Sequence, residues 1–289
     1  MLGEFAAICR RCSAGQASAN HSDCVMIERF AQMPSALRAN ARWERLGPTA
    51  IPAMIVRPES AAAEPAPVVI WMHGRTAHKE LDPGRYLRWM RAGIGACAVD
   101  LPGHGERFDA RLQEPDQSFA VVRQMIDEID EIAAAISMMN EFDSQYMGIG
   151  GMSAGGMATL ARLCRPHPFA CTSVEATTGS WKHQRHRDMF QNVPQEWIDE
   201  LNPIDHLASW REIPLQAIHA VGDEWVPIEG QAAFIDALRA RYHNPEIIEF
   251  IRYDRTGAPG EHIGFGRMSA DAKDRQRAFL ERWLVDAAA

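Results

Sequence analysis

The amino-acid sequence predicts an α/β fold with a mostly parallel, doubly wound sheet and a small helical cap insertion. Two observations lead to this prediction. Short, wholly apolar segments, typical of strands buried on both faces of a parallel sheet, alternate with longer segments of helical periodicity. A glycine-rich turn also joins one of these strands directly to a helix. The length of 289 residues suits one large domain of this kind.

Strands and helices are expected to alternate along most of the chain. Residues 41–57 have the pattern of an opening hairpin. The later strands are expected at 68–72, 94–99, 146–150, 169–174, 215–221 and 247–251, and the helices at 81–92, 117–139, from the glycine turn to about 165, and at 228–240 and 270–285. In the segment 117–139, Val122, Met125, Ile126 and Ile129 recur at helical spacing, which predicts one buried face.

Two segments do not fit this alternation. Residues 1–40 are small and polar, so we expect an N-terminal extension followed by a domain over 41–289. Residues 178–210 are too long for a simple connection and carry several tryptophans and basic side chains. We expect this second segment to form the cap.

Composition and charge exclude several classes of protein. The net charge of −8 and the lack of a basic stripe argue against nucleic-acid binding. No apolar run approaches the roughly 18 residues that span a bilayer, so no membrane association is expected. The N-terminus lacks the apolar core of a secretory signal, which predicts a cytoplasmic protein. The sequence leaves homo-oligomerisation open.

A group of sulfur and nitrogen ligands lies near the N-terminus. Cys9, Cys12, His21 and Cys24 supply four donors of the kind that Zn²⁺ binds tetrahedrally. Their spacing matches no common zinc pattern, so we favour a loose extension without a metal.

The segment 151–155 has the pattern G-x-S-x-G, with a strand before it and a helix after it. In this context Ser153 lies on a sharp turn at the carboxyl edge of the sheet. Its hydroxyl would then be at the N-terminus of a helix, where developing negative charge is stabilised. The sequence therefore predicts that Ser153 is a nucleophile.

Other motifs surround this serine in the expected order. They are W-M-H-G-R at 71–75, D-L-P-G-H-G at 100–105, H-A-V-G-D-E-W-V-P at 219–227 and G-E-H at 260–262. With these motifs, residues 50–285 resemble the α/β-hydrolase superfamily, in particular its dienelactone-hydrolase-like and prolyl-oligopeptidase-like serine esterases. Alanine at position 220 replaces the glycine that the family usually has there.

The resemblance implies a catalytic triad and an oxyanion hole. Asp223 would be the acid and His262 the base, in the chain order Ser, Asp, His that this fold uses. The imidazole would remove the serine proton, and the aspartate would orient the imidazole and stabilise its charged form. The backbone N–H groups of Arg75 and Ala154 would bind the oxyanion.

The cap is expected to determine substrate specificity. Trp181 would line the apolar part of a substrate, and Arg185 and Arg187, with Lys182, would contact an anionic part. The alternative, left open, is that these side chains form a solvated helix face.

The predicted function is hydrolysis of small carboxylic esters through an acyl-serine intermediate, with no metal and no organic cofactor. Peptidase, thioesterase and acyltransferase activities use the same triad and remain alternatives. We rank peptidase lower because the chain shows no propeller of the oligopeptidase type. A non-catalytic binding protein is the alternative from another class.

Overall fold

A computed structural model describes residues 33–58 and 64–288 of the chain. The compact unit that holds the sheet begins at Pro34 rather than at residue 41. The reason is helix α2 (Ser35–Ala39), which packs against helix α3 and buries Leu37 completely. Most of the expected N-terminal extension, including its cysteines, lies outside the described residues.

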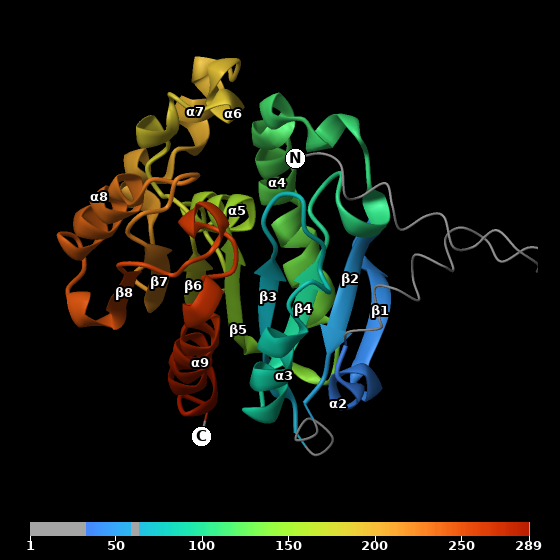
Figure 1. The fold of residues 1–289 in the computed structure, drawn as a ribbon. Coiled ribbons are helices and arrows are strands. Elements are labelled where there is room, and N and C mark those ends of the chain that lie inside the picture. The colour runs from blue at the N-terminus through green and yellow to red at the C-terminus, as the bar shows by residue number, and fades with distance from the viewer. Residues whose placement is uncertain (1–32, 59–63, 289) are drawn as a thin grey trace, which may run out of the picture. The chain divides into compact units, whose positions relative to one another are not determined.

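An eight-stranded sheet forms the centre of this unit, with the strand order β1-β2-β4-β3-β5-β6-β7-β8 (Figure 1). The strands are β1 (Ala41–Leu46), β2 (Ile51–Val56), β3 (Ala66–Met72), β4 (Gly95–Val99), β5 (Phe142–Met152), β6 (Cys171–Glu175), β7 (Leu215–Ala220) and β8 (Ile248–Tyr253). β1 pairs antiparallel with β2, and β2 pairs antiparallel with β4. The remaining pairs are parallel. The prediction of a mostly parallel sheet with an opening hairpin is confirmed.

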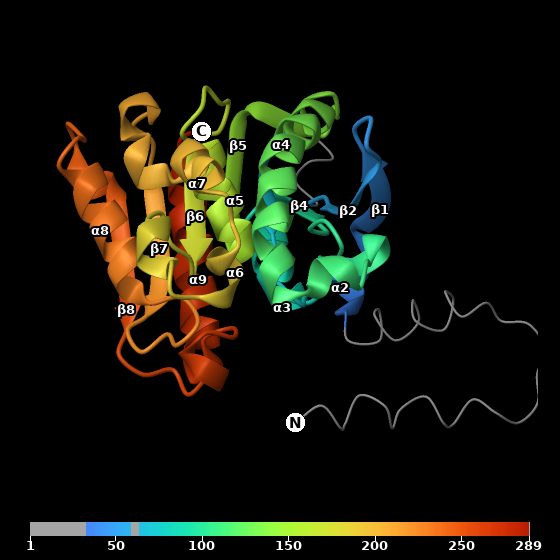
Figure 2. The same ribbon diagram turned by 90° about the horizontal axis from the view of Figure 1, so that it is seen from above.

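Helices cover the sheet on both faces. They are α3 (Pro83–Arg91), α4 (Ser118–Ser137), α5 (Ala154–Arg162), α8 (Ile228–Arg239) and α9 (Ser269–Leu280), which continues as a π-helical turn, Glu281–Val285. α3 and α9 pack together and lie in front of the sheet in Figure 1. α4 and α5 lie side by side in Figure 2 and pack against β5. This doubly wound arrangement confirms the fold class predicted from the alternation of segments.

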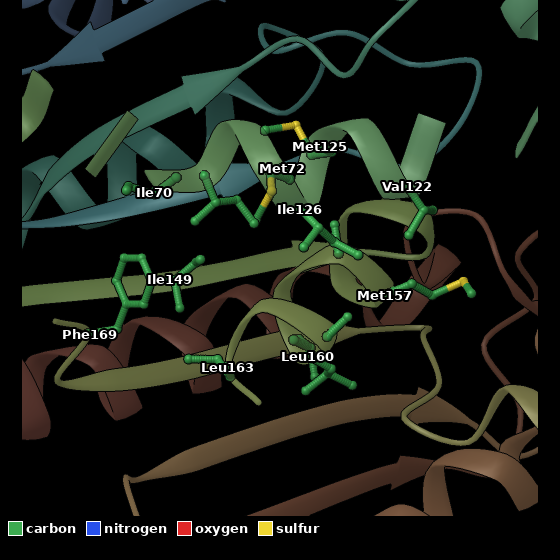
Figure 3. Packing of buried hydrophobic residues seen from close by; sticks show 14 of the residues in the cluster. Ile70, Met72, Val122, Met125, Ile126, Ile149, Met157, Leu160, Leu163 and Phe169 are labelled. Carbon is green, nitrogen blue, oxygen red and sulfur yellow. The ribbon is translucent and has the colours of Figure 1, made fainter. Parts of the chain in front are cut away.

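The main core fills the space between the sheet and the α4–α5 pair (Figure 3). The apolar face expected for residues 117–139 is buried in α4 and includes Val122, Met125, Ile126 and Ile129. Figure 3 shows Met125 and Ile126 on the side of α4 where the strand residues Met72 and Ile149 lie. β3 and β5 pair in parallel up to Met72 and Gly151, and both are buried in their carboxyl-terminal halves. The loops that follow the two strands are therefore held close together.

The segment 178–210 runs between β6 and β7 as short helical pieces. These are Trp181–Gln184, α6 (Asp188–Gln191), α7 (Gln195–Leu201), Pro203–Asp205 and Leu207–Ser209. We call this segment the cap. α6 packs against α4 and against the turn Pro115–Gln117.

The position of Trp181 corrects one expectation. Its side chain is 0% exposed and packs edge-on against Phe119 at 5.1 Å between ring centroids, with Phe190 beside it. Trp181 therefore anchors the cap to the core and does not line a surface that a substrate can reach. Burying so large an aromatic ring stabilises the cap on α4.

Candidate active site

Ser153 lies on a strained turn between β5 and α5. Its φ of 51° and ψ of −115° are outside the regions that side-chain-bearing residues normally adopt. A Cβ at position 155 would lie 2.4 Å from the carbonyl oxygen of Met72, and one at position 151 would lie 2.5 Å from Gly155. Only glycine fits at both places, which explains the G-x-S-x-G spacing. A backbone outlier of this kind costs about 1–3 kcal/mol and is typical of functional sites.

His262 joins this serine to Asp223. The Nε2 atom of His262 is 3.1 Å from Ser153 Oγ, and its Nδ1 atom is 2.8 Å from Asp223 Oδ2. The three side chains come from the loops after β5, β7 and β8. The structure thus brings the three predicted triad residues into one hydrogen-bonded chain.

Asp223 is held as a carboxylate. Its Oδ1 atom accepts the amide N–H groups of Trp225 at 2.9 Å and Val226 at 2.8 Å. Burial alone would raise the pKa of Asp223, but His219, His262 and the Val226 amide outweigh it and lower the pKa. A carboxylate fixed in this way accepts the Nδ1–H of His262, which leaves Nε2 free to accept the serine proton.

Two residues near the triad were missed by sequence reasoning. His219 is buried in β7, and its Nε2 lies 2.8 Å from the Val226 carbonyl oxygen and 3.4 Å from Asp223 Oδ2. Trp225 stacks on the ring of His262, with 5.0 Å between centroids. The H-A-V-G-D-E-W-V-P motif contained both residues, but only the folded turn shows which of its side chains face the triad.

The two predicted oxyanion amides lie on either side of Ser153. Ala154 is the first residue of α5, so its N–H has no acceptor within the helix. Arg75 follows β3, where a Cβ on the preceding Gly74 would lie 3.4 Å from Ser153 Cβ. Both backbone groups therefore adjoin the serine.

His73 fixes the peptide that carries the Arg75 N–H. Its Nε2 accepts the Leu101 N–H at 3.0 Å, so the proton is on Nδ1, which donates to the Gly74 carbonyl at 2.6 Å. Burial lowers the pKa of His73 to about 4, which keeps the ring neutral near pH 7. Because the Gly74 carbonyl and the Arg75 N–H belong to one planar peptide, holding the first orients the second.

A buried lysine supports the glycine loop at 100–105. Lys79 Nζ contacts Asp100 at 2.8 Å, Glu106 at 2.5 Å and Glu80 at 3.1 Å. Burial lowers the pKa of Lys79, but the charges of Asp100 and Glu80 outweigh it and raise the pKa above its usual value. A Cβ at position 105 would lie 2.0 Å from Asp100 Oδ1, so the loop needs glycine there.

The predicted cap residues differ in what they contact. Arg185 is exposed and donates to Gln195 Oε1 at 2.9 Å. Arg187 donates to the carbonyl oxygen of Glu224 at 2.5 Å, and therefore touches the loop that carries Asp223. Lys182 pairs with Asp205 at 2.8 Å. Of these contacts, only that of Arg187 joins the cap to the rest of the domain, and the other two lie within the cap. The substrate role of Arg185 and Arg187 stays a prediction.

A cavity of about 290 Å³ opens at the C-terminal end of α5, opposite the end that holds Ser153. Its lining includes Cys164, Arg165, Glu200 and His206. It is therefore separate from the serine. Within the described residues, no group of three or more His, Cys, Asp or Glu side chains is arranged to hold a metal ion, and no helix is long and apolar enough to cross a membrane.

Comparison with known proteins agrees with this architecture. The profile of the prolyl oligopeptidase family matches residues 87–286. This chain belongs to that family. As a member, it is a hydrolase of the α/β-hydrolase superfamily, and the suspected resemblance is confirmed.

Two curated relatives carry esterase names. Esterase YjfP of Escherichia coli is 25% identical over 202 residues, which cover 65% of this chain and 81% of that protein. The putative esterase YitV of Bacillus subtilis is 24% identical over 224 residues, which cover 70% of this chain and 86% of that protein.

Solved structures share the fold. A puromycin-hydrolyzing peptidase of Mycobacterium tuberculosis superposes with a TM-score of 0.69 at 20% identity. The match covers 88% of this chain but only 41% of that protein, so this chain spans less than half its length. TT1662 of Thermus thermophilus gives a TM-score of 0.64 at 20% identity, with 84% of this chain and 98% of that protein covered.

Proposed function

We propose that this hydrolase cleaves carboxylic esters of small molecules, with Ser153 as nucleophile, His262 as general base and Asp223 as the acid that orients it. The observation that carries the proposal is the imidazole of His262, which lies 3.1 Å from the serine oxygen and 2.8 Å from the carboxylate. The esterase names of the curated relatives support the choice of ester.

In the first half of the reaction, Ser153 Oγ attacks the ester carbonyl while His262 Nε2 accepts its proton. The charge that develops on the carbonyl oxygen is stabilised by the amides of Arg75 and Ala154. His262 then gives the proton to the departing alcohol, which leaves an acyl group on Ser153. In the second half, His262 takes a proton from water as the water attacks the acyl group, and returns that proton to Ser153 Oγ as the acid is released.

Amide hydrolysis is the second candidate. The structural relatives include a peptidase that hydrolyses puromycin and several acylaminoacyl peptidases, and the same triad cleaves amides. The two activities differ in the leaving group, because an amine leaves less readily than an alcohol and depends more strongly on protonation by His262.

A fluorophosphonate probe and a matched set of substrates test the proposal. We expect the probe to label the wild-type protein and to leave Ser153→Ala unlabelled. We expect kcat/KM for p-nitrophenyl butyrate to exceed that for the thioester and for the p-nitroanilide with the same acyl group. Failure of the probe to react refutes the nucleophile, and faster cleavage of the anilide replaces esterase by amidase.

A further inference from the structure

The side chain of Arg75 carries a positive charge at the edge of the sheet where Ser153 lies. The guanidinium is half-buried against the loop that follows β4, where its Nη2 donates to the Gln113 carbonyl. Gln113 in turn donates from its side chain to the Gly103 carbonyl at 2.6 Å. The guanidinium is therefore held by a neutral acceptor, the Gln113 carbonyl, whose residue is itself anchored to Gly103.

No carboxylate pairs with this guanidinium among residues 33–58 and 64–288. Its Nε atom is buried and has no hydrogen-bond partner there. Burial lowers the pKa of Arg75, and the nearby charge of Glu114 opposes this shift only in part. The more deeply buried Arg85 pairs with Glu175 at 2.7 Å, and Arg162 pairs with Asp130 at 2.5 Å. A partly buried cation without a paired carboxylate is costly, and such groups are typical of binding sites.

The position of Arg75 relates this charge to the reacting atoms. Its backbone adjoins Ser153, as the 3.4 Å separation between the Ser153 Cβ and a Cβ placed on Gly74 shows. Ligands of open α/β sheets bind outside the carboxyl ends of the strands, where β3, β4 and β5 end together. The turn Pro115–Gln117, which closely follows Gln113, packs against α6 of the cap. The backbone of Arg75 thus lies beside the reacting serine, and its side chain extends from there to the loop after β4.

We propose that Arg75 is a specificity residue whose guanidinium binds a carboxylate carried by the ester substrate, so that the preferred substrates are half-esters of dicarboxylic acids. This inference rests on the proposed esterase function. A planar guanidinium that no carboxylate of the protein neutralises matches a carboxylate better than it matches a neutral group. The proposal places the anion contact at the end of β3 and not in the cap, where the sequence had led us to expect it. In the cap, Lys182 is already paired with Asp205, and Arg187 with the Glu224 carbonyl.

Two esters that differ only in charge test the proposal. They are the p-nitrophenyl half-ester of glutaric acid and the same compound with its free carboxylate methylated. For the wild type, we expect kcat/KM to be higher for the half-ester. In Arg75→Gln the ratio of the two values should fall roughly 10- to 100-fold, chiefly through KM, as expected for the loss of a hydrogen bond to a charged group. Arg75→Lys, which keeps the charge but not the fork, should give an intermediate ratio.

Two further arginine variants control this experiment. Arg111→Gln removes an exposed charge from the loop after β4 and should leave the ratio unchanged. If the ratio of the two kcat/KM values falls in Arg185→Gln and not in Arg75→Gln, the contact lies in the cap and the proposal is overturned. A wild type with no preference for the half-ester, or an Arg75→Gln variant with an unchanged ratio, also overturns it.

Binding without turnover separates this proposal from the esterase function. Calorimetric titration of Ser153→Ala with glutarate should show saturable binding that is lost when Arg75→Gln is added. If the protein binds glutarate in this way but the wild type hydrolyses no ester, the esterase function is refuted and the anion site at Arg75 is supported. Ester hydrolysis by the wild type together with no glutarate binding keeps the esterase and refutes the site. If Arg75→Gln does not fold, the glutarate titration of folded Ser153→Ala and the ratio for Arg75→Lys still decide.

Discussion

Trp225 covers one face of the His262 imidazole, with the two ring planes 28° from parallel. Trp225 as a residue is 43% exposed, and its backbone N–H donates to Asp223 Oδ1. A Cβ at position 260 would lie 2.7 Å from the indole nitrogen, so glycine at this position lets the ring approach. Trp225 therefore covers this face of the imidazole, while its backbone helps to hold the Asp223 carboxylate.

Loss of this cover should slow catalysis. We expect Trp225→Ala to lower kcat roughly 2- to 10-fold, the range that corresponds to one aromatic pair, because the positively charged imidazole loses a stabilising ring face. Trp225→Phe should retain most of the rate. Steady-state kinetics with p-nitrophenyl acetate measure the effect, and equal rates for Trp225→Ala and wild type would show that the stacking has no catalytic role.

Ser153 and His262 should act as a unit. Ser153→Ala or His262→Ala should reduce kcat by roughly 10⁶, the scale observed for triad deletions in a serine protease. The double variant should be little slower than either single variant, because each change already removes the same proton transfer. Losses that add in the double variant would mean that the two residues act independently.

The buried ion cluster at Lys79 should matter more for stability than a surface pair. Lys79→Met removes the buried cation that contacts Asp100 and Glu80, and we expect a loss of about 3–5 kcal/mol in the free energy of unfolding. Lys182→Met removes an exposed pair with Asp205 and should cost less than about 1 kcal/mol. Urea denaturation measures both, and similar values for the two variants would contradict the role of burial.

His73 should make the protein less stable in mild acid. Its pKa is about 4 when folded, below the ordinary value of about 6.5 expected for the unfolded chain. The stabilisation is therefore complete above about pH 6.5 and is lost as the pH falls towards 4, by about 3 kcal/mol in total. Protonation of His73 places a second ring N–H against the Leu101 N–H, and two donors that face each other explain why stability falls as the pH falls.

Urea unfolding between pH 4 and 7 tests this linkage. The stability of His73→Gln should fall less steeply over this range than that of the wild type. His243→Gln, which changes a side chain that is 98% exposed, should follow the wild type. Parallel pH curves for His73→Gln and wild type would exclude His73 as the source.

The strands were predictable because parallel strands buried on both faces favour apolar runs, and β3 and β4 are apolar and buried at every position. The serine turn was predictable because its glycines are sterically required. Lys79 was not predictable, since Asp100 and Glu106 lie 21 and 27 residues away and only the pairing of β3 with β4 brings them together.

The cap shows why composition is a weaker guide than periodicity. Trp181 and Arg185 are four positions apart in the same segment, yet one is fully buried and the other is exposed. The difference arises from Phe119 and Phe190, which close around Trp181. Short helical pieces have too few turns to display a periodic face, so their orientation depends on such tertiary contacts.

The hydrogen bond between Ser153 and His262 joins residues 109 positions apart, and the one between His262 and Asp223 spans 39. Contacts so distant in sequence close large loops and form late in folding. A chain that has acquired its helices but not its complete sheet therefore has an ordinary, unreactive serine. Recovery of probe labelling after dilution from denaturant should lag behind recovery of helical circular dichroism, so that nucleophilic reactivity appears only in molecules that have finished folding.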